Sequence, residues 1–157
     1  MPNNVGRVAQ EWFDNVVGKE ERAELTALEG DEDALKERFG RELSFGTGGL
    51  RGIVGMGTNC MNVYTVGKAS RGLIAYMRAH GMKKIAVSYD SRRKSLLFAQ
   101  TAAGIFAENG IFVVLVRELM PTPFLSFLTR EEKCNMSVMI TASHNPAAYN
   151  GYKVYGG

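Results

Sequence analysis

Residues 85–116, with the sequence IAVSYDSRRKSLLFAQTAAGIFAENGIFVVLV, decide the fold. Two short runs within this stretch, 85–89 and 111–116, have the length and apolar content of buried strands. Between them, residues 96–109 repeat apolar side chains at helical spacing, and Gly110 ends that pattern. Strands that alternate with helices predict an α/β fold with a mostly parallel sheet.

The segments on either side extend the same alternation. Before the stretch, residues 62–81 have helical spacing, with Asn62 as the N-cap. After it, the Pro-Thr-Pro break at 121–123 precedes a short helix at 124–130 and a third buried strand at 136–140. We therefore expect a three-layer α/β/α sandwich around a mostly parallel mixed sheet.

The first 42 residues differ in charge from the rest of the chain. They contain six basic and eleven acidic side chains, a net charge of −5, whereas residues 43–157 contain thirteen basic and five acidic, a net of +8. An amphipathic helical pattern at 5–17 is followed by charged helical segments at 20–28 and 31–39. We expect an acidic helical N-terminal extension over residues 1–42, with a packing role favoured over a binding role, and an α/β domain over 43–157.

Composition excludes several classes of protein. The chain has 157 residues and is 45% hydrophobic, which suits an ordinary globular domain that buries a core without disulfides or a structural metal. The two cysteines, Cys60 and Cys134, form no zinc-binding or disulfide pattern. No apolar run has the length of a membrane span or begins like a signal peptide, so we expect a cytoplasmic protein with no membrane contact.

The basic charge of residues 43–157 raises the local concentration of anions. Charge alone leaves phosphorylated metabolites, nucleic acid and acidic lipid open as partners. Nucleic acid is disfavoured, because the sequence has no basic helix with interleaved aromatic side chains. The carboxyl ends of the predicted strands, where open α/β sheets bind ligands, deliver polar residues at 90–93, 118–123 and 141–146.

A glycine-rich stretch at 45–52, FGTGGLRG, is the first candidate site. Glycines let backbone N–H groups approach a phosphate, and Arg51 can donate two parallel hydrogen bonds to its oxygens. The stretch is neither a dinucleotide fingerprint, since Arg51 stands where the third glycine belongs, nor a Walker A loop, since no Gly-Lys-Ser/Thr follows. A run of tight turns without a ligand is the alternative.

The second candidate is TASHNP at 141–146, which follows a predicted buried strand and places Ser143 at the edge of the sheet. Downstream, Asn150-Gly151 predicts a tight turn that returns Lys153 beside Ser143, where a lysine can stabilise a phosphoryl group or transfer a proton. A capped turn and an exposed lysine are the plain alternatives. A Ser-His-Asp hydrolase using Asp90 is disfavoured because G-x-S-x-G is absent.

Four motifs occur in order: FGTGGLRG at 45–52, DSR at 90–92, PTP at 121–123, and TASHNP at 141–146 continuing to NGYK at 150–153. Together they resemble domain I, the N-terminal α/β/α domain, of the phosphoglucomutase/phosphomannomutase (α-D-phosphohexomutase) family. The resemblance spans about residues 40–157. The acidic extension is similar to that of the long-chain branch, which contains phosphoglucomutases and phosphopentomutases.

The resemblance implies an intramolecular phosphotransferase. Such an enzyme interconverts sugar 1-phosphate and sugar 6-phosphate, or pentose 1- and 5-phosphate, through a phosphoserine and a sugar bisphosphate. Ser143 would carry the phosphoryl group and bind Mg²⁺ through its phosphate oxygen, and a sugar 1,6-bisphosphate would be the activator. Arg51 and Lys153 would neutralise charge and transfer protons, while His144 would lie close to the reacting hydroxyl.

Other residues take supporting roles under the same resemblance. Gly48 and Gly49 would contact phosphate beside the two cations, and Asp90, Arg92 and Asn145 would hold the serine loop rather than react. This division suits phosphoryl transfer, which depends chiefly on positioning and charge neutralisation.

The sequence departs from the family pattern in what it lacks. The acidic metal loop, the sugar-binding loop and the distal phosphate site of domains II–IV are absent, and residue 157 comes before domain I would be complete. We therefore expect a fragment that is inactive alone, that needs the remaining domains of a longer chain, and that can self-associate through an uncovered sheet face or edge. The preferred sugar stays open, and the alternative is a non-catalytic phosphate-binding α/β module.

Overall fold

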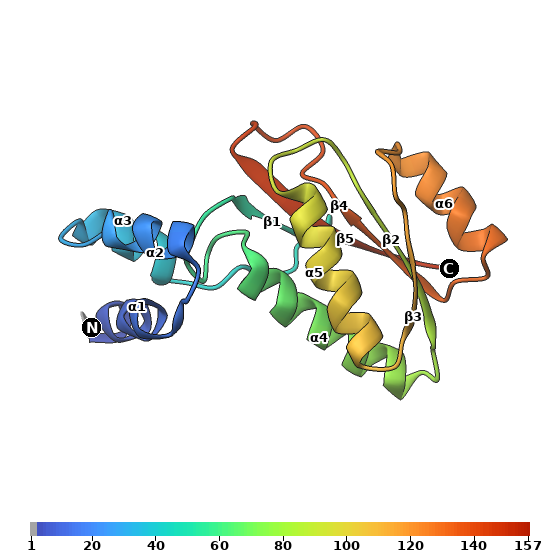
Figure 1. The fold of residues 1–157 in the computed structure, drawn as a ribbon, viewed down its shortest axis with the longest axis horizontal. Coiled ribbons are helices and arrows are strands. Elements are labelled where there is room, and N and C mark those ends of the chain that lie inside the picture. Colours follow the sequence, from blue (N-terminus) through green and yellow to red (C-terminus); the bar gives the residue numbers. More distant parts are fainter. Residues whose placement is uncertain (1–2) are drawn as a thin grey trace.

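The computed structural model describes residues 3–157, and the first helix and the last strand of this range lie toward opposite ends of the molecule (Figure 1). Six helices and five strands are formed by these residues. In chain order they are α1 (Asn3–Asn15), α2 (Lys19–Thr26), α3 (Glu32–Phe39), β1 (Leu50–Ile53), α4 (Val63–Ala79), β2 (Lys84–Tyr89), α5 (Ser95–Glu108), β3 (Phe112–Leu115), α6 (Thr122–Glu131), β4 (Met136–Ile140) and β5 (Tyr149–Gly156).

The strands form one mixed sheet in the order β1-β5-β4-β2-β3. The pairs β4–β2 and β2–β3 are parallel, as the alternation of strands and helices predicts, whereas β1–β5 and β5–β4 are antiparallel. Parallel and antiparallel pairs are therefore equal in number among the described residues, although the sequence predicted a mostly parallel sheet. The antiparallel pairs come from two glycine-containing segments, Leu50–Ile53 and Tyr149–Gly156, that carry no strand pattern.

The prediction of a tight turn at Asn150-Gly151 was wrong. Both residues lie inside β5, where Asn150 pairs with Gly52 and Gly151 pairs with Arg51 of β1. A Cβ atom at Gly151 would lie 2.5 Å from the carbonyl oxygen of Thr141, so this glycine serves close packing of the backbone rather than a turn. The chain turns earlier, where the amide of Tyr149 donates to the carbonyl oxygen of Pro146 at 2.9 Å.

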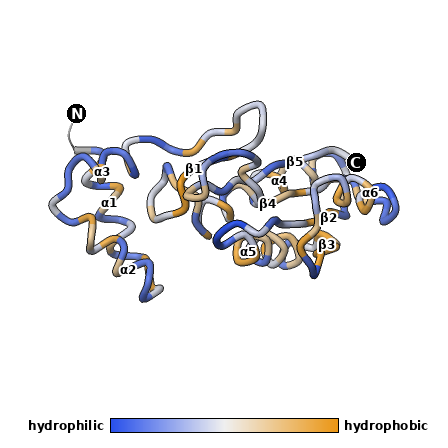
Figure 2. Tube along the Cα trace, turned by 90° about the horizontal axis from the view of Figure 1, so that it is seen from above, coloured by the Kyte–Doolittle hydropathy of each residue, from blue (hydrophilic) through white to orange (hydrophobic). Residues whose placement is uncertain are grey.

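Helices cover both faces of the sheet, which confirms the predicted three-layer arrangement (Figure 1). Along β2, Ile85 and Val87 belong to the main core cluster with α4 and α5. Ala86, which points to the other face, packs with Leu125 of α6. Hydrophobic stretches gather along α5 and β3, while the trace of α1–α3 is mostly hydrophilic (Figure 2).

The three N-terminal helices form a small cluster of their own that packs on the sheet-containing part. Met56, from the loop before α4, is buried in this cluster. The carboxylate of Glu24 accepts from the Met56 amide at 2.9 Å, and Arg38 donates to the Met56 carbonyl at 3.2 Å. The ring of Trp12 meets Tyr64 of α4 edge-on, with centroids 5.3 Å apart. The predicted helices of the extension are thus confirmed, and their cluster holds the loop that lies between β1 and α4.

Two findings concern what the chain does not form. No helix within residues 3–157 combines the length and the apolar content that a membrane crossing needs. Cys60 and Cys134 are buried free thiols, and burial raises the pKa of each.

Candidate functional site

Ser143 lies on the loop that follows β4, in a backbone conformation that few residues other than glycine adopt. Its φ is 55°, in the left-handed region, and its side chain is half-buried. The preceding loop residue Thr141 is buried, and its hydroxyl oxygen accepts a hydrogen bond from the Ser143 amide at 3.1 Å. The loop therefore presents the serine hydroxyl at the carboxyl end of a central strand, as the sequence predicts.

Lys153 reaches Ser143 from the neighbouring strand. In β5 it pairs with Met139 of β4, and its Nζ donates a hydrogen bond to the Ser143 Oγ. Burial, and secondarily the guanidinium of Arg51, lower the pKa of Lys153. Both causes destabilise the ammonium form, so this amine gives up its proton more readily than an exposed lysine. The predicted juxtaposition of Lys153 and Ser143 is confirmed, although a strand pairing produces it rather than the predicted turn.

The glycine-rich stretch brings Arg51 to the same place. Arg51 lies on β1, and its Nη1 donates to the side-chain oxygen of Asn145 at 3.3 Å. A Cβ atom at Gly48 would come within 2.5 Å of Nη2 of Arg51, and one at Gly49 would overlap the carbonyl oxygen of Tyr152. Gly48 thus leaves room for the guanidinium, and Gly49, with a φ of 92°, lets the backbone pass against β5.

Direct phosphate binding by the two glycines stays a prediction. The Gly49 amide already donates to the carbonyl oxygen of Gly46 at 3.1 Å, and the return bond from Gly46 to Gly49 has the same length. These paired bonds close a tight turn, which is the alternative that the sequence left open. The turn and the close approach to β5 explain the glycines without a ligand, while Arg51 keeps an exposed side chain beside the serine loop.

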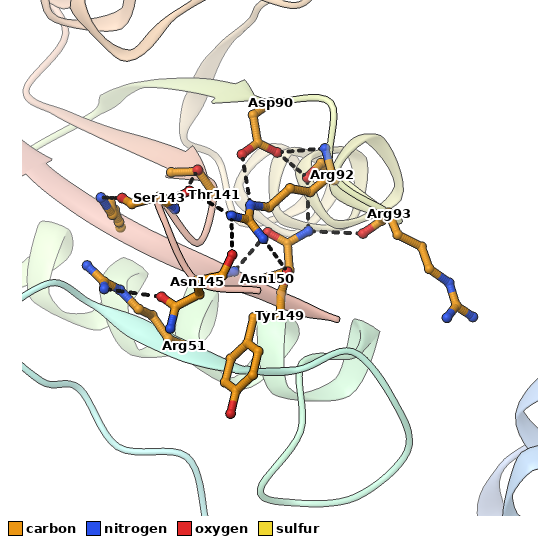
Figure 3. A network of polar contacts seen from close by, with 12 residues as sticks. Arg51, Asp90, Arg92, Arg93, Thr141, Ser143, Asn145, Tyr149 and Asn150 are labelled. Atoms are coloured by element: carbon orange, nitrogen blue, oxygen red, sulfur yellow. Dashed lines mark hydrogen bonds and ion pairs between the residues drawn. The ribbon is translucent and has the colours of Figure 1, made fainter. Parts of the chain in front are cut away.

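Arg92 holds the serine loop from within (Figure 3). Its Nε lies 3.5 Å from a carboxylate oxygen of Asp90, and the second oxygen of Asp90 accepts from the Arg92 amide at 2.9 Å. The two terminal nitrogens of the guanidinium donate to four carbonyl oxygens of the loop at 2.6–3.1 Å. These carbonyls belong to Ser143, Asn145, Pro146 and Tyr149.

The network extends to two residues that sequence reasoning missed. The hydroxyl of Ser95, at the start of α5, donates to Asp90 at 2.8 Å. The side-chain amide of Asn150 donates to Ser95 Oγ at 2.9 Å and to the carbonyl oxygen of Arg93 at 3.1 Å. Ser95 and Asn150 are both buried. A serine that follows three basic residues and an asparagine inside NGYK give no signal of these roles, because only the tertiary fold brings the two residues together.

His144 differs from the other predicted site residues. Its side chain is exposed on the loop, and among residues 3–157 it forms no side-chain hydrogen bond. Its place close to the reacting hydroxyl stays a prediction.

The donor set suits an anion better than a metal ion. The serine hydroxyl accepts a hydrogen bond from the ammonium of Lys153, and the guanidinium of Arg51 contacts Asn145 on the same loop. The carboxylate of Asp90 is occupied by Arg92 and Ser95. Within the described part of the chain, no three or more His, Cys, Asp or Glu side chains are grouped to hold a metal ion. Mg²⁺ prefers an octahedral set of oxygens that includes carboxylates, so residues 3–157 do not fit a complete Mg²⁺ site.

Comparison with known proteins assigns this constellation to a family. The family model described as phosphoglucomutase/phosphomannomutase, alpha/beta/alpha domain I, matches residues 42–157. The chain belongs to the phosphoglucomutase/phosphomannomutase family. A phosphopentomutase from Pongo abelii is 38% identical over 154 residues, which cover 92% of this chain and 25% of that protein. A phosphoglucomutase from Staphylococcus aureus (strain USA300) is 43% identical over 122 residues, which cover 77% of this chain and 22% of that protein.

Solved structures of the phosphoglucomutase/phosphomannomutase family show the same fold. A protein assigned as a phosphomannomutase from Thermus thermophilus superposes with a TM-score of 0.69 at 32% identity, over 74% of this chain and 26% of that one. A family member from Burkholderia thailandensis gives a TM-score of 0.59 at 25% identity, over 67% of this chain and 24% of that one. The chain spans about a quarter of the length of the curated relatives it matches.

Proposed function

We propose that this chain belongs to a phosphosugar mutase and carries the serine that is phosphorylated, Ser143. The observation that supports this most directly is the contact between Ser143 Oγ and Lys153 Nζ, with the guanidinium of Arg51 held on the same loop through Asn145. A hydroxyl that contacts one cation, on a loop that also holds a second cation, is suited to bear a dianionic phosphoryl group. Phosphoryl transfer depends mainly on such positioning and charge neutralisation.

Each residue has a defined task in the proposed reaction. A sugar hydroxyl attacks the phosphorus of phosphoserine, the new sugar O–P bond forms, and the bond from phosphorus to Ser143 Oγ breaks. Lys153, which contacts Ser143 Oγ, donates a proton to the departing oxygen. His144, exposed on the loop, accepts the proton that the sugar hydroxyl loses, and Arg51 neutralises charge on the phosphoryl oxygens.

The substrate class is a sugar monophosphate, which the enzyme converts through a sugar bisphosphate intermediate. The relatives include a phosphopentomutase and a phosphoglucomutase at similar identity. We therefore propose two candidate reactions, a 1-/6-phosphate exchange on a hexose and a 1-/5-phosphate exchange on a pentose. A sugar 1,6-bisphosphate would prime Ser143 in the hexose case.

The remaining parts of the machinery are proposed to lie outside this chain. Because the relatives are about four times longer, we propose that further domains bind the sugar and its distal phosphate and that this chain alone does not turn over substrate. Mg²⁺ bound to the phosphoserine oxygen stays a prediction, and its other ligands would come from those domains. Self-association also stays a prediction; the edge strand β3 bears Phe112, which is 65% exposed.

Phosphopeptide mapping tests the proposal. The protein that carries this chain is incubated with glucose 1,6-bisphosphate and Mg²⁺, digested and examined by mass spectrometry. We expect one added phosphoryl group at residue 143 and loss of mutase activity in Ser143→Ala, while Ser126→Ala on α6 behaves as wild type. Unmodified Ser143, together with reversible phosphate binding and full activity in Ser143→Ala, would establish the alternative of a non-catalytic phosphate-binding module.

A further inference from the structure

Two residues with strained backbone conformations lie at or next to the serine loop, the segment 141–148 between β4 and β5. Among residues 3–157, the residues other than glycine with positive φ are Lys94, Lys133 and Ser143. Two of these three flank the same hydrogen-bond network, because Lys94 directly precedes Ser95 and Ser143 lies on the loop held by Arg92. Such conformations cost energy in a side-chain-bearing residue and persist only where the surroundings hold them.

The network that holds them begins at a buried donor on β5. Asn150 is completely buried, and its side-chain nitrogen donates to two acceptors, the hydroxyl of Ser95 and the carbonyl oxygen of Arg93. Its side-chain oxygen accepts from the amide of Gly151 at 2.8 Å. Asn150 therefore holds two neighbouring points of the chain: the turn that contains Lys94, through the Arg93 carbonyl, and the start of α5, through Ser95.

The network continues from α5 to the loop through a charge pair. Because Asn150 donates to the hydroxyl of Ser95, the Ser95 proton is directed at the carboxylate of Asp90. Asp90 pairs with the guanidinium of Arg92, which donates to the carbonyl oxygen of Ser143 at 2.6 Å. Each member thus fixes the orientation of the next, and the last bond ends on the residue that carries the reactive hydroxyl (Figure 3).

We infer that Ser95 and Asn150 are positioning residues that hold Ser143 in its left-handed backbone conformation and so aim its hydroxyl at Lys153. The inference rests on the proposed function for its catalytic consequence, but the positioning itself is a property of the loop. Both residues lie away from the reacting atoms and act through Asp90 and Arg92. The side-chain donor of Ser95 is used for Asp90, and the side-chain amide of Asn150 donates to Ser95 and to the carbonyl oxygen of Arg93.

Amide hydrogen exchange of the loop tests the positioning directly. Three loop amides have internal partners: Ser143 donates to Thr141, Asn145 to Ala142 and Tyr149 to Pro146. In Ser95→Ala and Asn150→Ala, we expect these amides to exchange about tenfold faster, the factor for the loss of one net hydrogen bond. Amides inside α5 should keep the wild-type rate, and Ser95→Thr, which retains a hydroxyl, should restore the loop.

Ser70→Ala is the matched control. Ser70 is a buried serine with one side-chain partner, the hydroxyl of Tyr152 at 3.0 Å, and it does not touch the loop. We expect this variant to leave loop exchange unchanged. Equal acceleration of loop and α5 amides in Ser95→Ala, or a loop as protected as in wild type, would overturn the inference.

The phosphorylation of Ser143 by glucose 1,6-bisphosphate gives a second readout in the protein that carries this chain. We expect Ser95→Ala and Asn150→Ala to lower the maximal rate of phosphorylation about tenfold and to leave the half-saturating donor concentration unchanged, because the serine is misaligned rather than the donor site lost. A change in half-saturation alone would contradict the positioning role. If wild type is never phosphorylated, the proposed function fails, while loop exchange still decides the inference.

Discussion

Lys153 Nζ donates a hydrogen bond to Ser143 Oγ across ten residues of chain. The contact exists because β5 runs antiparallel to β4 and carries Lys153 back past the end of the strand that delivers Ser143. The hydroxyl and the amine are therefore held together by the sheet before any substrate binds. Because the sheet already limits the relative motion of the two side chains, aligning them for the reaction costs less entropy.

The proton affinity of Lys153 should depend on Arg51. Burial and the Arg51 guanidinium lower the pKa of Lys153, so its amine is neutral at lower pH than an ordinary lysine. In Arg51→Met we expect the pH profile for acylation of Lys153 to move to higher pH, though not to that of a free lysine, because burial remains. Peptide mass spectrometry measures the labelling, with the exposed Lys68 as internal reference.

Arg130→Met provides the matched control for that experiment. Arg130 is an exposed arginine at the end of α6, and within residues 3–157 its side chain bonds only to Ser126 on its own helix. Replacing Arg130 should leave the pH profile for acylation of Lys153 unchanged. An unchanged profile in Arg51→Met would mean that Arg51 does not act on Lys153.

Arg92 should be irreplaceable even by lysine. Its guanidinium pairs with Asp90 and donates to four loop carbonyls, whereas a lysine ammonium is a compact point charge with three donors. We expect Arg92→Lys to lower the free energy of unfolding by about 2–4 kcal/mol, because several partly buried carbonyl groups lose charged donors together. Urea denaturation measures the loss.

The neighbouring Arg93 supplies a control with the same substitution. Its side chain is exposed and points away from the loop (Figure 3). Arg93→Lys should change the free energy of unfolding by no more than about 0.5 kcal/mol. Similar losses in Arg92→Lys and Arg93→Lys would show that the guanidinium contacts contribute nothing specific.

The elements that sequence reasoning predicted share a local signal. The strands β2, β3 and β4 are short runs rich in apolar residues, and α4 and α5 repeat apolar residues at helical spacing, so each pattern is complete within its own segment. The residues themselves made Arg51, Ser143 and Lys153 candidates, with plain alternatives left open, and the resemblance to a known family supplied their roles. The local pattern thus gave the framework and the candidate residues, and the resemblance gave their catalytic roles.

The features that were missed depend on contacts between distant segments. Strands β1 and β5 contain glycines that lower strand propensity, and they form because Arg51 pairs with Gly151, which is distant in the chain. Asn150 looked like a turn residue for the same reason: nothing local shows that its amide has a buried acceptor in Ser95. Local propensity was overridden by tertiary packing at the positions that hold the site.

Two glycines with opposite environments offer a final test of the site's construction. Gly49 has a φ of 92°, and a Cβ there would overlap the carbonyl oxygen of Tyr152 on β5. We expect Gly49→Ala to lower the free energy of unfolding by about 2–4 kcal/mol, because a left-handed alanine is strained and the backbone must separate from β5. Thermal or urea unfolding measures the change.

Gly104, exposed within α5, is the matched position, since a Cβ there meets nothing within 4 Å. Gly104→Ala should raise the free energy of unfolding by about 0.5–1 kcal/mol, because alanine loses less backbone entropy in a helix. The two substitutions add the same methyl group, but we expect opposite changes in the free energy of unfolding. If Gly49→Ala were neutral, the glycine turn would not fix the approach of β1 to β5, and the placement of Arg51 beside Lys153 would need another cause.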